Sequence, residues 1–297
     1  MDVFRSSKSV DDSIVPKTQT ELYSALVRIL LGRHLTAHKV EGNKRWNLQS
    51  MAELPSDIEL SLFQLSEVAY TGIIQQQLVF HTLPSNMETL SLINQEYDEQ
   101  GSISHNFLHL TVQEFLAAYY VSKLPLFKQA QILDDSVGKE HLMIMLRFVA
   151  GLTKFHIQQS TETSFYVQVS KFVKCLFGSR SPADCLRTVY YGSKDNRMES
   201  LRWAFETQDK LLLRQVLGTE RLELDLSSWT LTAFDCYILG DCIRNSACQW
   251  RLNFGNCNIT EMGIKMLSGM TGGSLSHVEV ILLPFNPVKT GGAYLGK

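Results

Sequence analysis

A short apolar pattern recurs three times near the end of the chain, and it restricts the possible folds more than any other feature. Apolar residues alternate with other residues in stretches whose equivalent first positions are Leu224, Leu252 and Ile281. The interval from Leu224 to Leu252 is 28 residues, and the interval from Leu252 to Ile281 is 29 residues. A period of this length indicates supersecondary units that stack side by side, because one unit alone cannot bury its apolar face.

Each unit fits the pattern L-x-L-x-x-N/C-x-L, which is typical of a leucine-rich repeat with one strand and one helix. Trp229 fits the N/C position only loosely. In the other two units this side chain is expected to turn inward and hydrogen-bond the loop backbone. Helices are expected over 232–243 and 260–267, between the strand motifs. The repeat positions are Leu224, Leu226, Leu231, Leu252, Phe254, Cys257, Ile259, Ile281, Leu283, Asn286 and Val288.

The composition excludes several classes of partner and compartment. Among 297 residues, 44% are hydrophobic and 20% are charged, and the net charge of −2 provides no general attraction for nucleic acid or an anionic membrane. The most apolar window, 142–152, is too short for a membrane span and carries Arg147. The six cysteines form no C-x-x-C pair and have no zinc-ligand spacing, which favours reduced thiols in the cytoplasm.

Four regions are predicted along the chain. Residues 1–15 form a flexible polar tail, residues 16–122 a winged-helix domain, residues 123–220 a helical domain, and residues 221–297 about three incomplete repeats. The predicted fold is mainly α with a small β wing, followed by the start of an α/β leucine-rich-repeat solenoid of the ribonuclease-inhibitor kind. Because no polar capping unit follows the third repeat, we expect a fragment or an incomplete gene model.

Local signals predict the elements of the winged-helix region. Thr18 and Glu21 form a capping box before a first helix whose buried face would carry Leu22, Leu26, Ile29 and Leu30. A second helix is expected over 56–70. Gly32 and Gly72 are expected to mark the ends of these helices. Two short apolar runs, 77–80 and 107–110, are the candidate strands of the wing.

The segment around His109 is the most informative one for function. Thr111 and Glu114 predict a capping box at a helix start, with Leu110 and Phe115 as a hydrophobic staple. His109 would then lie ahead of free backbone N–H groups at the positive end of the helix dipole, where a phosphate can bind. The residues alone favour instead a histidine that packs or hydrogen-bonds a nearby carbonyl, since helix N-termini are common and one histidine is a weak anion site.

This segment resembles the end of the winged-helix domain in NACHT-containing NOD-like receptors, whose pattern is F-x-H-x-[ST]-x-Q-E-[FY]-x-A-A. In that family the histidine contacts the β-phosphate of bound ADP and holds the receptor closed, so the resemblance implies this role for His109. Residues 16–23 and 142–155 resemble further blocks of the winged-helix and helical domains. The matched positions of the pattern are Phe107, His109, Thr111, Gln113, Glu114, Phe115, Ala117 and Ala118.

The chain departs from the family by lacking the residues that hold and hydrolyse a nucleotide. No G-x-x-x-x-G-K-[ST] loop is present, and 138–140 lacks both the upstream glycine and the hydroxyl. Neither G-x-S-x-G nor H-E-x-x-H occurs, and His34 and His38 lack a third metal ligand. We therefore expect no enzyme activity, catalytic residue, metal or cofactor for this chain alone. ADP or ATP would belong to the full-length receptor.

Two functions follow from these patterns. The first is a regulatory and ligand-sensing fragment of a cytosolic NOD-like innate immune receptor, with the receptor's NACHT core as one partner and other proteins bound through the repeats. The alternative is a leucine-rich-repeat interaction scaffold that does not switch. A hydrolase is disfavoured by the absent motifs. Neither nucleic acid nor a membrane is expected as a partner.

Overall fold

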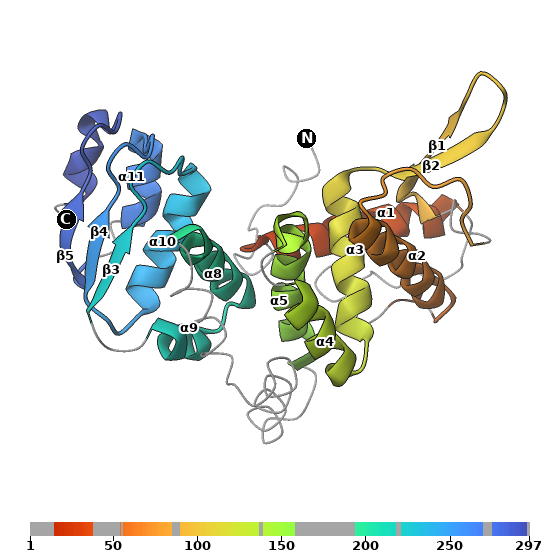
Figure 1. Cartoon of the computed structure of the whole chain (residues 1–297), viewed down its shortest axis with the longest axis horizontal. Helices are drawn as coiled ribbons and strands as arrows, with labels where there is room; N and C mark the ends of the chain where they lie inside the picture. Colours follow the sequence, from red (N-terminus) through yellow and green to blue (C-terminus); the bar gives the residue numbers. More distant parts are fainter. Residues whose placement is uncertain are drawn as a thin grey trace. The chain divides into compact units, whose positions relative to one another are not determined.

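The computed structural model describes residues 15–37, 54, 56–84, 90–136, 139–157, 194–217, 221–269 and 275–295. The chain divides into two compact units, one up to residue 161 and one from residue 162 onward (Figure 1). This division falls inside 123–220, which the sequence predicted as one helical region. Residues 1–14 of the predicted tail and residues 158–193 of the predicted helical domain lie outside the described residues.

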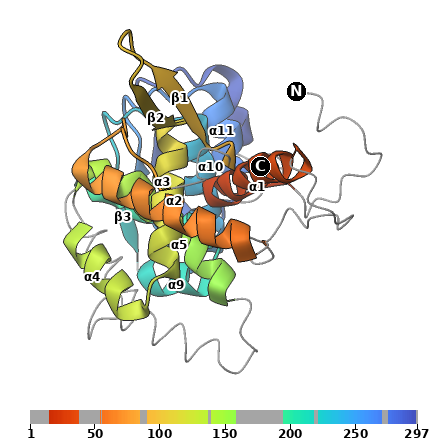
Figure 2. The same ribbon diagram turned by 90° about the vertical axis from the view of Figure 1, so that its right-hand side faces the viewer.

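The first unit is built around one central helix, α3. It has helices α1 (Gln19–Ala37), α2 (Ser56–Gln75), α3 (Leu110–Lys123), α4 (Leu126–Ser136) and α5 (Met143–Ile157), strands β1 (Ile93–Tyr97) and β2 (Ile103–Phe107), and a 3-10 turn, Glu140–Leu142. Helix α3 packs against both α2 and α5 (Figure 2). The rings of Phe115 on α3 and Phe148 on α5 meet edge to face at 5.3 Å, and Tyr23 of α1 contacts both. The buried rings of Phe115 and Phe148 form the centre of the core, and the half-buried Tyr23 packs beside them.

Helix α1 begins where its capping residues predict, but it buries a different face. The Glu21 amide donates to Thr18 Oγ1 at 3.1 Å. Leu22 and Leu26 are 52% and 37% exposed, whereas Val27 and Leu31 are buried. The predicted apolar face was therefore wrong, because the buried face also includes small or polar side chains, Thr20, Ser24 and Arg28.

The two glycines that were expected to end helices lie inside them instead. Gly32 lies within α1, and α2 continues past Gly72 to Gln75. A Cβ atom on Gly72 would lie 2.6 Å from both Phe80 Cζ and Gln113 Nε2. Gly72 thus allows a close approach of neighbouring segments and does not act as a stop signal.

The β hairpin of the first unit differs from the predicted one. Strands β1 and β2 pair antiparallel, with Ile93 opposite Phe107 and Tyr97 opposite Ile103. The run 77–80 is not a strand of this hairpin; Phe80 forms an isolated bridge with His105. Leu110, at the end of the other predicted strand, already belongs to α3. The apolar signal was misleading because four of the five residues of β1 are exposed.

The second unit contains a three-stranded parallel sheet in the order β3-β4-β5. Its strands are β3 (Leu222–Asp225), β4 (Trp250–Asn253) and β5 (Val278–Leu282), and its helices are α8 (Lys194–Thr207), α9 (Lys210–Leu217), α10 (Ala233–Asn245) and α11 (Glu261–Ser268), followed by the 3-10 segment Lys289–Tyr294. Helices α10 and α11 lie between successive strands, where the sequence predicted them. Figure 1 shows both helices on the same side of the sheet.

The strand register explains why the two repeat intervals differ by one residue. Leu224 pairs with Leu252, and Leu252 pairs with Ile281. The register of β4 against β5 shifts between Trp250 and Arg251, which pair with Val278 and Val280. A β-bulge therefore accommodates the additional residue of the longer interval.

Asn286 and Cys257 occupy the N/C positions of their units and bind loop backbone. The Asn286 Oδ1 atom accepts from the amides of Cys257 and Ile259 at 3.0 and 2.9 Å, and its Nδ2 atom donates to the Phe254 carbonyl at 2.6 Å. The Cys257 thiol donates to the Leu226 carbonyl at 2.9 Å. Each side chain thus links its own turn to the turn of the preceding unit.

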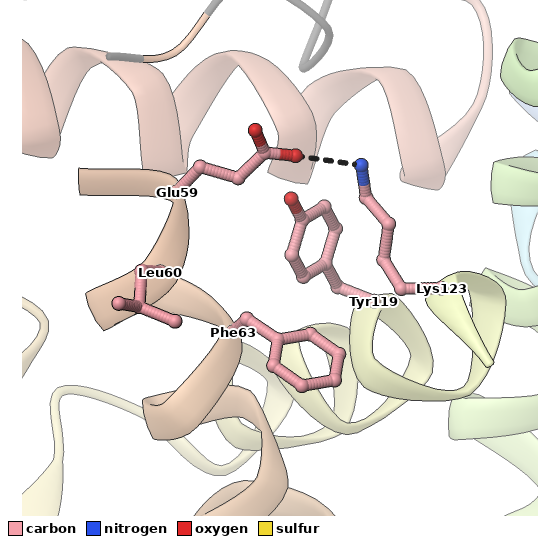
Figure 3. Close-up of a pocket in the computed structure, with 5 residues that line it drawn as sticks. All are labelled: Glu59, Leu60, Phe63, Tyr119 and Lys123. Carbon is pink, nitrogen blue, oxygen red and sulfur yellow. Dashed lines mark hydrogen bonds and ion pairs between the residues drawn. The ribbon is translucent and has the colours of Figure 1, made fainter. Parts of the chain in front are cut away.

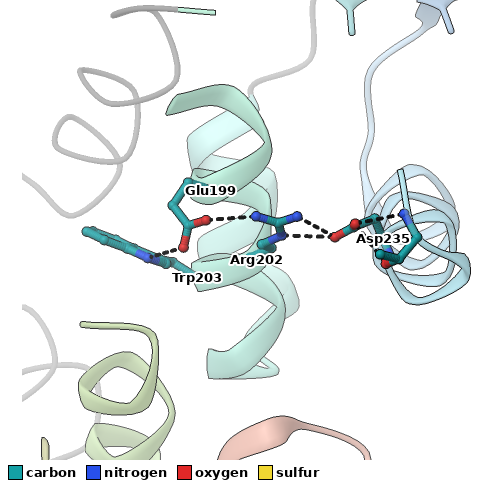
Figure 4. A network of polar contacts seen from close by, with 5 residues as sticks. Glu199, Arg202, Trp203 and Asp235 are labelled. Atoms are coloured by element: carbon teal, nitrogen blue, oxygen red, sulfur yellow. Dashed lines mark hydrogen bonds and ion pairs between the residues drawn. The ribbon is translucent and has the colours of Figure 1, made fainter. Parts of the chain in front are cut away.

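A buried polar network joins α8 to the first repeat helix, α10 (Figure 4). The Arg202 guanidinium donates to Asp235 Oδ1 through Nε at 2.9 Å and Nη2 at 2.7 Å. The same guanidinium donates to Glu199 at 3.0 Å, and the Trp203 indole donates to the other Glu199 oxygen at 3.1 Å. Asp235 also forms a reciprocal capping box with Thr232 at the start of α10. These contacts therefore fix helix α8 to helix α10, which packs on the repeat sheet.

Candidate functional site

His109 is the N-cap residue of α3 and lies at the surface of the first unit. Its backbone is extended, with φ −158° and ψ 149°, and its Nδ1 atom accepts a hydrogen bond from the Thr111 amide at 3.1 Å. An accepting Nδ1 carries no proton, so the neutral imidazole has its proton on Nε2. Among the described residues, Nε2 has no hydrogen-bond partner. His109 therefore presents one N–H donor at the positive end of a 14-residue helix.

The start of α3 differs from the predicted capping box. Three first-turn amides are already used by His109: Thr111 donates to its ring, and Val112 and Gln113 donate to its carbonyl at 2.9 and 3.2 Å. The expectation of free backbone N–H groups next to His109 was wrong, because the histidine itself is the cap. The predicted staple was also wrong, since Leu110 is the first helical residue and is 46% exposed.

Most residues of the histidine motif are buried, whereas His109 itself is exposed. The Gln113 side chain donates to the Gln77 carbonyl at 3.0 Å, which attaches α3 to the segment after α2. The positions that lie in the core are Phe107, Gln113, Glu114, Phe115, Ala117 and Ala118. Most of the motif is therefore required for packing, whereas His109 is exposed and available to a ligand or partner.

Glu114 is a buried carboxyl group on α3, only 5% exposed. Burial raises its pKa from the ordinary 4.5 to about 7, and the positive charge of Arg147 on α5 opposes the increase. The carboxyl group therefore takes up a proton close to neutral pH, one turn beyond the His109 cap. This group was predicted as part of a capping box, but its burial gives it a different role.

We expect Glu114→Gln to remove a pH dependence of stability. Because the folded-state pKa is raised, the stabilisation is complete below about pH 4.5 and is lost as the pH rises through 7. The variant should match the wild type at about pH 4 and exceed its free energy of unfolding by about 2 kcal/mol at pH 8. Urea titrations followed by circular dichroism measure both values. The exposed Glu99→Gln is the control, and equal pH dependence of Glu114→Gln and wild type would contradict this expectation.

The second unit offers a charged sheet face as a candidate interaction surface. In β3 and β4, Glu223 and Arg251 are exposed and alternate with buried residues. Arg251 forms ion pairs with Glu223 at 3.5 Å and Glu279 at 3.6 Å, and Arg221 binds Glu279 at 2.7 Å. These residues were not predicted as functional. The alternation of buried and polar positions within each L-x-L strand is the signal that identifies them.

An apolar spot adjoins this charged face. Leu282 is 50% exposed at the end of β5, and Phe285 in the following turn is 88% exposed. Most of the predicted repeat positions lie instead in the core: Leu224, Leu226, Leu231, Leu252, Phe254, Cys257 and Ile259 are buried, and Ile281, Leu283, Asn286 and Val288 are half-buried. The repeat pattern therefore builds the scaffold, and the residues between its positions form the accessible surface.

The described residues show neither a metal centre nor a membrane-crossing element. They contain no cluster of three or more His, Cys, Asp or Glu residues suited to hold a metal ion. No described helix combines the length and apolar character needed to cross a membrane. Cys236, Cys242, Cys248 and Cys257 are buried thiols, and burial raises the pKa of each of them. The side chain of His34 and the whole of His38 lie outside the described residues.

Comparison with known proteins gives one distant relative. No protein-family model matches the chain. A zebrafish (Danio rerio) protein described as "NACHT, LRR and PYD domains-containing protein 1 homolog" is 25% identical over 278 residues. The chain is similar to a NACHT- and LRR-containing protein. The alignment covers 86% of this chain but 19% of the relative, so the chain spans about a fifth of that protein's length. This similarity agrees with the resemblance to NOD-like receptors seen around His109.

Proposed function

We propose that this chain is the regulatory and ligand-sensing part of a cytosolic NOD-like innate immune receptor. The observation that carries the proposal is the outward-facing His109, whose Nε2–H is the available donor in a motif that is otherwise largely buried. In this proposal the first unit acts as an autoinhibitory winged-helix element and the second unit begins a leucine-rich-repeat solenoid. The distant similarity to a NACHT- and LRR-containing protein supports the same family.

The nucleotide role assigns one contact to this chain. His109 would donate from Nε2 to a β-phosphate oxygen of ADP, favoured by the positive end of α3. The nucleotide itself would be held by a NACHT core, because this sequence has no phosphate-binding glycine-rich loop. We therefore propose that the chain by itself is not an enzyme and binds ADP or ATP weakly. The helical domain predicted over 123–220 would transmit or restrain movement.

The repeat unit would supply the interaction surface of the receptor. Its outward charges alternate in sign and adjoin an apolar spot at Phe285, which suits a protein partner better than a polyanion. The overall charge of −2 and the four buried thiols are compatible with a cytoplasmic protein that binds neither nucleic acid nor membranes.

The nucleotide role predicts a specific effect of His109 substitutions. In a chain that also carries the nucleotide-binding core, His109→Ala should accelerate ADP release roughly ten-fold and raise basal self-association, as expected for loss of one charge-assisted hydrogen bond. Release is measured with a fluorescent ADP analogue. His109→Asn is the matched control, because asparagine caps a helix well but cannot place a donor at the position of Nε2. An unchanged release rate in both variants would refute nucleotide sensing.

A non-switching repeat scaffold is the second candidate, and the compactness of the second unit favours it. In that case a protein partner would bind through the sheet face with an affinity that is independent of nucleotide and of His109. Charge reversal by Arg251→Glu would weaken such a partner, whereas His109→Ala would leave the affinity unchanged. A change in affinity upon addition of ADP would favour the receptor role instead.

A further inference from the structure

A small pocket lies between α2 and α3 in the first unit, away from His109 (Figure 3). Its volume is about 310 Å³, and it is lined by Glu59, Leu60 and Phe63 from α2 and by Tyr119 and Lys123 from α3. This volume is at the lower end of the range for small-molecule sites in proteins. The pocket combines two apolar side chains with an ammonium group, a phenol and a carboxylate.

Tyr119 places an unused hydrogen-bond donor at the pocket. The residue is 1% exposed, and its hydroxyl oxygen is buried without a hydrogen-bond partner among the described residues. Figure 3 shows the phenol oxygen directed toward the Glu59–Lys123 ion pair. A buried hydroxyl without a partner is unfavourable, and protein interiors generally supply a partner for such a group. A ligand that accepts a hydrogen bond at this point would remove that unfavourable contribution.

The ion pair beside Tyr119 can open at little cost. Lys123 Nζ lies 3.0 Å from Glu59 Oε1 and 5.3 Å from the centre of the Tyr119 ring. The Glu59 side chain is 44% exposed and the Lys123 side chain 24%, so both can be rehydrated. If Glu59 turns into solvent, the Lys123 ammonium and the Tyr119 hydroxyl remain as two donors on the same side of the pocket. The carboxylate of a ligand can therefore replace the Glu59 carboxylate beside Lys123.

We propose that this pocket binds a small monocarboxylate with an apolar or aromatic body. The ligand carboxylate replaces Glu59 on Lys123 and accepts a second hydrogen bond from Tyr119, while its body packs against Leu60 and Phe63. Leu60 is 60% exposed and gains apolar contact when the pocket is filled. A phosphate is disfavoured, because the pocket has a single cation, a nearby carboxylate and predominantly apolar walls. The site is independent of the proposed nucleotide and repeat functions.

The test compares three ligands that share one body. In the full chain, 3-phenylpropionate should bind with a dissociation constant of about 1 mM, as expected for a ligand of this size. The matching 3-phenylpropanol and 3-phenylpropylamine should bind at least ten-fold more weakly. Binding is followed by the methyl resonances of Leu60 in NMR spectra of labelled protein. Equal affinities of the acid and the alcohol, or no shift at ten times the expected constant, would overturn the proposal.

Substitutions of the polar pocket residues are expected to change the affinity for 3-phenylpropionate in opposite directions. Lys123→Met should weaken 3-phenylpropionate at least ten-fold, and Tyr119→Phe about five-fold, since each removes one donor. Glu59→Gln should instead tighten binding several-fold because it removes the competing carboxylate. Glu67→Gln, on the same helix but outside the pocket, is the matched control and should leave the affinity unchanged. Weaker or unchanged binding in Glu59→Gln would contradict the exchange of carboxylates, and thermal unfolding establishes that each variant is folded.

Discussion

Asp235→Ala is expected to destabilise the second unit by about 3 kcal/mol, the largest single effect that we predict. The substitution leaves Arg202 without its strongest partner and removes half of the capping box of α10. Breaking a fully buried ion pair costs about 3 to 5 kcal/mol. The lower value applies here because the Arg202 side chain is 22% exposed and retains Glu199.

Tryptophan fluorescence during urea unfolding measures this effect, since Trp203, Trp229 and Trp250 all lie in the second unit. The matched control is Glu261→Ala, which removes a partly exposed Glu261–Lys265 pair at 3.7 Å and should cost less than about 0.5 kcal/mol. Similar losses in Asp235→Ala and Glu261→Ala would show that the network contributes little.

Asn286→Ala is expected to cost about 2 to 3 kcal/mol, because it removes the acceptor of two backbone amides and the donor to one carbonyl. The Cys257 and Ile259 amides lose their shared partner, and so does the carbonyl of Phe254. These groups belong to the second repeat, so the loss should appear in the same fluorescence transition and be accompanied by faster amide exchange at Cys257 and Ile259.

Two further asparagine variants separate the contributions. Asn286→Asp keeps an acceptor for the two amides but cannot donate to the Phe254 carbonyl, so it should recover only part of the stability. Asn253→Ala is the matched control, because the Asn253 side chain accepts a single hydrogen bond, from the Gly255 amide at 3.1 Å. A loss in Asn286→Ala no larger than that in Asn253→Ala would contradict the bridging role.

The elements that the sequence predicted well are those that repeat or that cap a helix locally. The intervals between Leu224, Leu252 and Ile281 were enough to locate the three strands, because the same apolar positions recur in each unit. The start of α1 followed from Thr18 and Glu21, three residues apart. Such signals lie within a few residues or at a fixed period, so they are visible without knowledge of the tertiary structure.

The features that were missed depend on contacts between distant residues. Strand β1 is polar and exposed, so its pairing with β2 left no apolar pattern. Arg202 and Asp235 are 33 residues apart, and neither residue is part of a periodic signal. At the candidate site, the motif identified His109, but the capping hydrogen bond follows from the backbone conformation of His109 itself. The pocket around Tyr119 likewise exists because two helices place their side chains together.

The cap that His109 forms on α3 also determines when this side chain is ready to bind. An exposed histidine ordinarily samples several rotamers, and a ligand that fixes one of them loses about 0.5 to 1.5 kcal/mol of binding free energy to that ordering. The hydrogen bond from Thr111 orders the imidazole in advance, so the proposed phosphate contact would be preorganised. Fraying of the first turn of α3 would release the ring and weaken the contact without any displacement of the ligand. The stability of the first turn of α3 and the affinity of His109 for its proposed ligand are therefore thermodynamically linked.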